Sequence, residues 1–236
     1  MVATQNTIRE IAIQQPSSLR VFERFGIDYC CGGSRPLAQA CEEMSIDPQA
    51  LLQALEQAAA AGGPAGRDWT KEPLEAICNH IVEKHHALIR TEVPRLQSLA
   101  QKVVSRHGAV HPELKEIQEL VESLGEELLQ HIQKEERMLF PFITELERGS
   151  GGGSRPHGCF GSIRNPIRVM LAEHDSSGSA LERMRSLSRD FTPPENAFPT
   201  YRGFYQALSE LKEDLHQHIH LENNILFPRA IEMEQG

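Results

Sequence analysis

A histidine followed four residues later by a glutamate occurs twice in this chain, each time in the same eleven-residue setting. The segments HIQKEERMLFP (131–141) and HIHLENNILFP (218–228) are identical at six of eleven positions, at an offset of 87 residues. Residues four apart on an α-helix lie about 40° apart around its axis, so each pair can address one point. The repeat therefore predicts two helices that each present a His/Glu pair on one face.

Both pairs lie inside the apolar stripe of their predicted helices, which is unusual for charged and polar side chains. The stripe residues are Ile117, Val121, Leu124, Leu128, Leu139 and Phe142 around His131 and Glu135, and Phe204, Leu208, Leu211, Leu215 and Leu226 around His218 and Glu222. Burying a carboxylate or an imidazole costs several kcal/mol unless it is paired or bound to a metal. The pattern thus predicts that a metal neutralises these four residues.

Further histidines extend the repeat to both halves of the chain. His174 lies on an apolar helix face, about 44 residues before His218, and the pair His85-His86 precedes His131 by a similar interval. In a four-helix bundle such positions return to one level of the core, as in di-metal carboxylate proteins. Two imidazoles for each metal, with the carboxylates bridging, then leave open coordination positions. Nitrogen and oxygen donors without thiolate favour iron, and manganese or zinc also fit.

Periodicity favours His85 over His86 as the ligand of the first long helix. The stripe of Leu74, Ile77, Ile81 and Leu88 is centred on His85, and His86 lies roughly 100° from that centre. Other polar residues near the repeat are weaker candidates. Glu173 and Asp175 flank His174 and are positioned to orient an imidazole, and Glu127 lies one turn before His131.

The chain as a whole is predicted to be all-α, because apolar residues recur at spacings of three and four residues and the alternating pattern of strands is nearly absent. We expect a small helical domain over residues 1–62 and a four-helix bundle over 63–236. Asp47-Pro48, Asn165-Pro166 and the capping box Thr192–Glu195 are predicted helix starts, and Pro141 and Pro228 predicted helix ends or kinks. Residues 61–66 and the Gly/Ser-rich segment 149–162, which carries Cys159, are predicted connections.

Charge and cysteine usage narrow the class of function. The net charge is −9 and no basic stripe is present, so nucleic acid is not an expected partner. No apolar run reaches the roughly 18 residues of a membrane helix, and no signal peptide is evident, so we expect no membrane association and a cytoplasmic location. The chain has five cysteines, and two of them are adjacent, so we expect reduced thiols and no disulfide framework. Cys30 and Cys31, in the turn DYCCGG, are candidates for thiol chemistry with a metal or a nitrosyl group.

These motifs together resemble the RIC (YtfE/ScdA/DnrN) family of di-iron proteins that repair iron–sulfur clusters. The resemblance runs from about Ile8 to Ile231 and rests on DYCCGG, Asp68-Trp69, HHALIRTEVP, AEHD and the paired H-x-x-x-E-x-x-x-L-F-P motifs. It implies a ScdA-type N-terminal domain and a hemerythrin-like bundle with two iron ions per chain, oxo- or hydroxo-bridged when oxidised. The ligands it implies are His86, His131, Glu135, His174, His218 and Glu222, with His86 taken from its position eight residues before Pro94.

The resemblance also implies a function, which is repair of iron–sulfur clusters damaged by oxidative or nitrosative stress. Iron delivery, or nitric oxide binding and reduction at the di-iron centre, is the expected chemistry, with Cys30 and Cys31 passing a nitrosyl group or iron between domains. Expected partners are damaged iron–sulfur proteins, nitric oxide and dioxygen, and a homodimer is compatible. The alternatives are a hemerythrin-like dioxygen or nitric oxide sensor without turnover, a ferritin-like store and a zinc-stabilised structural bundle.

Overall fold

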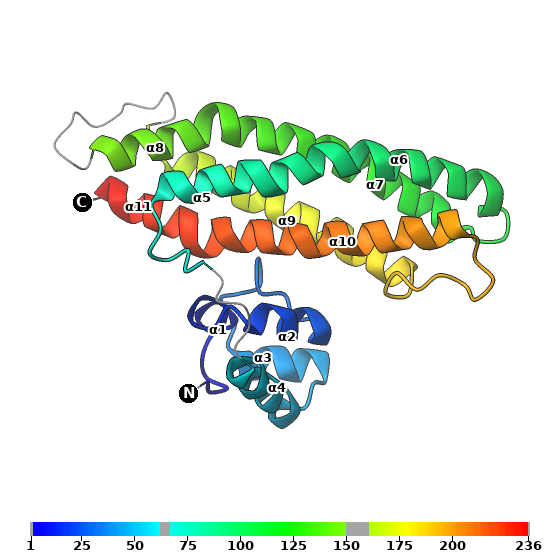
Figure 1. Ribbon diagram of the computed structural model, residues 1–236, viewed down its shortest axis with the longest axis horizontal. Coiled ribbons are helices and arrows are strands. Elements are labelled where there is room, and N and C mark those ends of the chain that lie inside the picture. Colours follow the sequence, from blue (N-terminus) through cyan, green and yellow to red (C-terminus); the bar gives the residue numbers. More distant parts are fainter. Residues whose placement is uncertain (1, 62–66, 150–160, 236) are drawn as a thin grey trace.

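Four antiparallel helical rods form a bundle, and a smaller group of helices packs against one side of it (Figure 1). The computed structural model describes residues 2–61, 67–149 and 161–235. The predicted connections at 61–66 and 149–162, with Cys159, lie almost entirely outside these ranges. The described residues form helices and their connecting turns and contain no strand, apart from an isolated bridge between Thr7 and Pro36. The all-α prediction is confirmed.

The small group comprises four short helices: α1 (Ile8–Gln14), α2 (Ser18–Phe25), α3 (Leu37–Met44) and α4 (Pro48–Ala60). The predicted start of α4 is confirmed, because Asp47 accepts a hydrogen bond from the Gln49 amide and Pro48 occupies the first helical position. Gly26 ends α2 with a left-handed φ of 70°. These helices enclose their own apolar core, whose largest members include Phe22, Tyr29 and Leu37.

Three of the four rods contain a π-helical turn that the sequence did not predict. The first rod consists of α5 (Leu74–His80), η1 (Ile81–His86) and α6 (Ala87–His107), and the second of α7 (Glu113–Lys134), η2 (Glu135–Leu139) and α8 (Phe140–Gly149). The third rod is α9 (Arg164–Leu187) alone. The fourth consists of α10 (Pro199–Leu221), η3 (Glu222–Leu226) and α11 (Phe227–Gln235). Consecutive rods run in opposite directions, so both ends of the bundle are built from all four (Figure 1). Each π-turn begins or ends at a predicted metal ligand.

Two apolar clusters fill the bundle on either side of the predicted ligands. One contains Ile89, Leu128 and Leu215, and the other contains Ile81, Leu139 and Leu221. Cys78 lies in the second cluster and is 3% exposed, so its thiol is part of the core packing. Gly125 of α7 allows close packing on α6, because a Cβ there would lie 2.7 Å from Val93 Cγ1.

Several predicted helix boundaries were wrong. The bundle's first rod begins at Leu74, and α9 begins at Arg164, one residue before the predicted Asn165 cap. The capping box at 192–195 does not form. Residues 189–191 adopt left-handed φ values of 52–59° that turn the chain, and the helix begins only at Pro199.

Proline does not end the rods either. Pro141 and Pro228 lie in the first turn of α8 and α11, immediately after a π-turn, and both rods continue for about two turns beyond them. A proline is tolerated there because its missing N–H is needed least where a helical segment begins.

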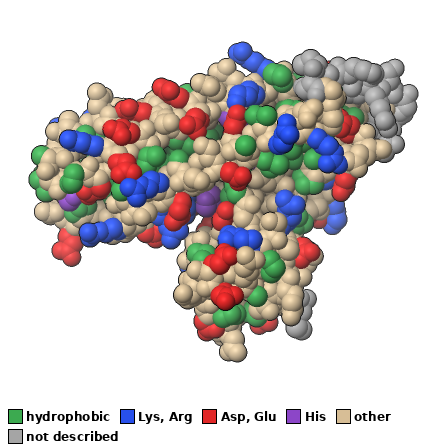
Figure 2. Space-filling model, turned by 180° about the vertical axis from the view of Figure 1, so that it is seen from behind, with side chains coloured by type: hydrophobic (Ala, Val, Ile, Leu, Met, Phe, Trp, Pro, Cys, Tyr) green, Lys and Arg blue, Asp and Glu red, His purple; other side chains and the backbone are tan. Residues whose placement is uncertain are grey.

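The small group docks on α10 and η3 through both apolar and polar contacts. Tyr29 packs edge-on against His216 and His220, with ring centroids 5.9 and 5.5 Å apart. Arg9 donates to the side chain of Asn224 over 2.6 Å, and Asn224 donates to the Tyr29 carbonyl over 2.9 Å. Acidic and basic side chains are interspersed over the visible face, on the bundle and on the small group alike (Figure 2). None of the described helices is both long and apolar enough to cross a membrane.

This docking is expected to weaken in acid. Burial lowers the pKa of His220 from 6.5 to about 4, so the folded protein holds this imidazole neutral. A lowered folded-state pKa contributes stability above pH 6.5, which is lost as the pH falls from 6.5 toward 4. The loss at pH 4 is roughly 3 kcal/mol at most. Urea unfolding at pH 7 and pH 4.5 should therefore show a smaller difference in His220→Gln than in the wild type, whereas equal differences would contradict this role.

Candidate metal centre

The six residues predicted as metal ligands come together in the bundle, and each rod contributes. Each is at most 4% exposed. The structure brings them to one level between the two apolar clusters. The residues are His86 at the end of η1, His131 and Glu135 at the junction of α7 and η2, His174 on α9, and His218 and Glu222 at the junction of α10 and η3.

Each glutamate faces two imidazoles from different rods, one with each carboxylate oxygen. Glu135 Oε2 lies 3.3 Å from His86 Nε2, and Glu135 Oε1 lies 3.2 Å from His131 Nε2. Glu222 Oε1 lies 3.1 Å from His218 Nε2, and Glu222 Oε2 lies 3.1 Å from His174 Nε2. The donor atoms therefore divide into two groups, His86/His218 and His131/His174, which share both carboxylates.

This arrangement fits a pair of metal ions better than it fits direct hydrogen bonding. Both oxygens of Glu135 and Glu222, and Nε2 of His86 and His218, are buried without a hydrogen-bond partner among the described residues. Buried polar atoms are rarely left in this state. Ligands at about 2.0–2.2 Å from one ion are separated by roughly 3.0–3.5 Å, which matches the separations here. The donor set contains imidazole and carboxylate but no thiolate, as suits iron, manganese or zinc.

Electrostatics keep the Glu222 carboxylate ionised and available as a ligand. Burial alone would raise the pKa of Glu222, but the imidazoles of His218 and His174 hold it well below its usual value. Burial would likewise lower the pKa of His131, and the nearby carboxylates, Glu135 foremost, raise it to about 9. Without metal, the raised pKa of His131 favours a positively charged imidazole beside the carboxylates. A divalent cation would take over that role.

Three of the four imidazoles are oriented through Nδ1 by a further polar side chain. Glu136 lies 2.7 Å from His86 Nδ1, Glu173 lies 2.8 Å from His131 Nδ1, and Asn223 lies 2.8 Å from His174 Nδ1. Such partners fix the ring and direct the other nitrogen to the metal. The two carboxylates are held in turn by Arg90 and Lys134.

Glu136 and Asn223 were not singled out from the sequence, although a signal was present. Each immediately follows the glutamate of its motif, at equivalent positions of the 87-residue repeat. Each contacts the first histidine of its own half, His86 or His174. The π-turn that begins at the glutamate alters the direction of this next side chain, and helical periodicity does not anticipate it.

A π-turn also explains why the apolar stripe is centred on His85 although His86 is the histidine that faces Glu135. η1 inserts one extra residue into the turn, which shifts everything after it by about 100° relative to a regular α-helix. The buried residue beyond the turn is accordingly Ile89 and not Leu88. His86 therefore occupies the direction that periodicity assigned to His85, in agreement with the family pattern.

His85 is fully buried beside the centre but does not join either donor group. Its ring stacks on that of His218 at a centroid distance of 5.4 Å, and its Nδ1 lies 2.9 Å from Asp214 Oδ1. Burial lowers the pKa of His85, and Asp214 opposes that effect. His85, which precedes His86, thus packs on the imidazole of His218. In the same way Glu173, which precedes His174, bonds to the imidazole of His131.

The predicted cysteine site lies in the small group, at its contact with the bundle. Cys30 is buried and Cys31 half-buried, and their Sγ atoms are 3.9 Å apart and unbonded. Asp28 shapes this loop by accepting hydrogen bonds from the amides of Cys30, Cys31 and Gly32. Cys31 lies beside Gly178 of α9 and lines a surface groove of about 760 Å³.

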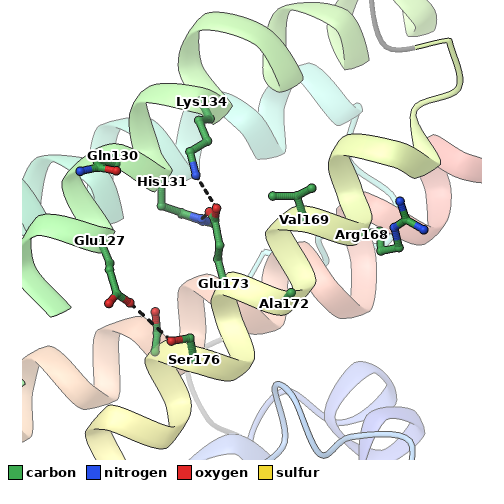
Figure 3. A pocket seen from close by; sticks show the side chains of 10 residues that line it. Glu127, Gln130, His131, Lys134, Arg168, Val169, Ala172, Glu173 and Ser176 are labelled. Carbon is green, nitrogen blue, oxygen red and sulfur yellow. Dashed lines mark hydrogen bonds and ion pairs between the residues drawn. The ribbon is translucent and has the colours of Figure 1, made fainter. Parts of the chain in front are cut away.

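A second pocket, of about 580 Å³, opens between α7 and α9 and reaches His131 (Figure 3). Glu173 points from α9 toward His131 and Lys134 across this pocket, while Glu127 contacts Ser176. Asp175, the other predicted neighbour of His174, is exposed. Glu173 is therefore in place to orient a ligand, and neither Glu127 nor Asp175 contacts one.

Replacing Glu173 with alanine should weaken metal binding by about 10–100-fold, the usual effect of losing a partner that orients a ligating histidine. Metal affinity measured by competition with a chromophoric chelator tests this expectation. Asp175→Ala is the matched control, because it removes an acidic residue from the other side of His174 without touching a ligand. Equal affinities for Glu173→Ala and the wild type would contradict an orienting role.

Comparison with known proteins agrees with this geometry in both parts of the chain. Residues 78–230 match the hemerythrin HHE cation binding domain, and residues 4–59 match ScdA_N, a domain of unknown function. The chain is 37% identical to the iron-sulfur cluster repair protein YtfE of Edwardsiella ictaluri over 231 residues, which cover 98% of this chain and 99% of that protein. It is 36% identical to YtfE of Escherichia coli O157:H7 with the same coverage. The chain belongs to the RIC (YtfE/ScdA/DnrN) family.

Membership accounts for the division of the molecule. The hemerythrin match contains all six residues of the metal centre, and the ScdA_N match contains Cys30 and Cys31. YtfE of Yersinia pseudotuberculosis serotype IB, 37% identical over 224 residues, likewise covers 95% of this chain. The matches to these relatives thus extend over both the bundle and the N-terminal group of helices.

Proposed function

We propose that this protein holds two iron ions between its four rods and uses them to repair damaged iron–sulfur clusters. The observation that supports this most strongly is the placement of Glu135 and Glu222, whose four oxygens face four imidazoles in two groups. Relatives that match nearly the whole chain are named iron-sulfur cluster repair proteins. Oxidative or nitrosative damage is the condition in which we expect the repair to operate.

In this proposal His86 and His218 would hold one ion and His131 and His174 the other, and Glu135 and Glu222 would serve both. When bound, the iron pair supplies redox-active metal with coordination positions open to small ligands such as nitric oxide or dioxygen. Glu136, Glu173 and Asn223 keep the imidazoles aimed at the ions. The pocket that reaches His131 gives iron or a diatomic molecule a way to approach the centre.

Iron analysis with Mössbauer spectroscopy tests the centre, and a cluster-repair assay tests the activity. We expect two iron ions per chain after anaerobic loading, and recovery of a purified iron–sulfur enzyme inactivated by peroxide or nitric oxide when the loaded protein is added. One tightly bound zinc ion, or many irons held by an assembled cage, would assign the structural or storage alternative instead. Nitric oxide bound reversibly under reductant, without consumption or repair, would assign a sensor.

Cys30 and Cys31 are proposed to pass iron or a nitrosyl group between the centre and a damaged client protein in the cytoplasm. Their free thiols, and the open groove beside Cys31, support this assignment. Replacing both cysteines with alanine should leave two irons bound and abolish most of the repair activity. Cys41→Ala, in the core of the same group, is the matched control. Undiminished repair by the double variant would refute the role of the thiols.

A further inference from the structure

Asn223 connects the metal centre to the cysteine loop through one buried side chain. Its Oδ1 lies 2.8 Å from His174 Nδ1, and its Nδ2 donates to the carbonyl oxygen of Cys30 over 3.3 Å. Asn223 is 6% exposed, so water does not compete freely for either contact. Its counterpart in the other half of the repeat, Glu136, contacts a histidine but is bound by Arg90 of the bundle instead.

The Cys30 carbonyl dictates which way the Asn223 amide faces. A carbonyl oxygen only accepts hydrogen bonds, so the NH₂ end of the amide must point to Cys30 and its oxygen must point to His174. His174 Nδ1 must then carry the proton, and its Nε2 presents a lone pair toward Glu222 and the metal position. The Cys30 carbonyl, a backbone group of the small group of helices, thereby leaves Nε2 of His174 free to bind a metal.

Only one of the two proposed metal positions has a histidine whose orientation depends on the Cys30 carbonyl. His86 and His131 are oriented by carboxylates that belong to the bundle, and His218 Nδ1 has no hydrogen-bond partner among the described residues. Of the four imidazoles, His174 is thus the one whose orienting side chain also bonds to the cysteine loop. That loop is itself shaped by Asp28, which lies away from the metal centre and accepts from three consecutive amides.

We propose that Asn223 is a positioning residue through which the Cys30–Cys31 loop sets the orientation of His174. A displacement of this loop is therefore transmitted more strongly to the ion that His131 and His174 would hold than to the ion that His86 and His218 would hold. The thiols and the iron pair are coupled by this hydrogen-bond chain without direct contact. The inference rests on the proposed iron pair, and the experiment below separates failure of the one from failure of the other.

The first test compares Asn223→Ala with Asn224→Ala in full-length protein loaded with ⁵⁷Fe. Both variants remove a hydrogen bond to the cysteine loop, since Asn224 donates to the Tyr29 carbonyl, but only Asn223 contacts a ligand. In Asn223→Ala we expect one of the two Mössbauer doublets to shift, and one of the two irons to be lost to a chelator about 10–100-fold faster. Asn224→Ala should keep both doublets and both release rates.

The second test moves the loop without touching the centre. Asp28→Ala removes the acceptor that orders the Cys30 and Cys31 amides, and we expect it to shift the same doublet as Asn223→Ala. In the Asn223→Ala background it should add no further shift, because residues acting through one chain are not additive. In the Asn224→Ala background the Asp28→Ala shift should persist.

The outcomes are distinguishable. A wild-type protein without an iron pair would overturn the proposed function itself. An iron pair whose spectrum is the same in the wild type and Asn223→Ala would overturn only the positioning role, as would an equal change at both irons. A shift by Asp28→Ala that persists in full without Asn223 would show that the loop acts through another route and would overturn the coupling.

Discussion

Replacing Glu222 with alanine is expected to leave the protein almost free of iron. One oxygen of this carboxylate faces His218 and the other faces His174, so its removal takes a ligand from both metal positions at once. The remaining donors are imidazoles and the single carboxylate of Glu135, which must then balance the charge of two ions in a buried site. We expect a fall from two irons per chain to less than about one-tenth of that after gel filtration, consistent with two positions each losing about 10–100-fold or more in affinity.

Elemental analysis of purified Glu222→Ala, with circular dichroism to verify that the helices remain, measures this effect. Glu145→Ala is a suitable control, because this exposed glutamate lies on α8, beyond the η2 turn, and contacts no ligand. His218→Ala offers a contrast, since it removes a donor from one position only and should retain more iron than Glu222→Ala. Retention of both irons by Glu222→Ala would contradict the bridging arrangement.

Removing the metal is expected to lower the thermal stability of the bundle strongly. A ligand that binds only the folded state stabilises it by about 4 kcal/mol at a free concentration of 1,000 times Kd, and two ions double that figure. For a chain of this size each kcal/mol shifts the melting temperature by about 2–4 °C, which gives a rise of roughly 15–30 °C on loading. The buried oxygens of Glu135 and Glu222, which lack hydrogen-bond partners in the described residues, are the physical source of the gain.

Differential scanning calorimetry of iron-free and iron-loaded protein, under anaerobic conditions, checks this expectation. Glu222→Ala should melt at the same temperature with and without iron, which separates specific binding from a general effect of the metal. The small group of helices has an apolar core of its own, so iron should raise its melting temperature less than that of the bundle. Equal melting temperatures for the loaded and iron-free wild type would contradict the stabilising role.

Much of the fold was predictable because it depends on residues that are close together in the sequence. The apolar stripe around His131 and Glu135 predicted their burial, and both are buried. Asp47-Pro48 predicted the start of α4 by backbone chemistry that needs no distant partner. The capping box at Thr192 failed for the opposite reason, since the left-handed turn at 189–191 is part of how the chain returns to the bundle.

The orienting residues of the centre were predicted less completely. Glu173 stood out because it adjoins His174, yet it contacts His131 on another rod. Glu136 and Asn223 reach their histidines only because a π-turn changes the direction of the residue that follows each glutamate. A π-turn is stabilised by what surrounds a helix, and a fixed period of 3.6 residues does not reveal it.

The sequence by itself determined that this chain is helical, that two His/Glu pairs are buried on repeated helices, and that their nitrogen and oxygen donors suit iron, manganese or zinc. These properties follow from residue spacing along one helix at a time. Helical periodicity pointed to His85 and the family resemblance to His86, and the tertiary structure places His86 beside Glu135. Only the tertiary structure joined Asn223 to both His174 and Cys30. The reason is physical, because the direction of a side chain after a π-turn, and the partner it meets, depend on how the rods and the small domain pack together.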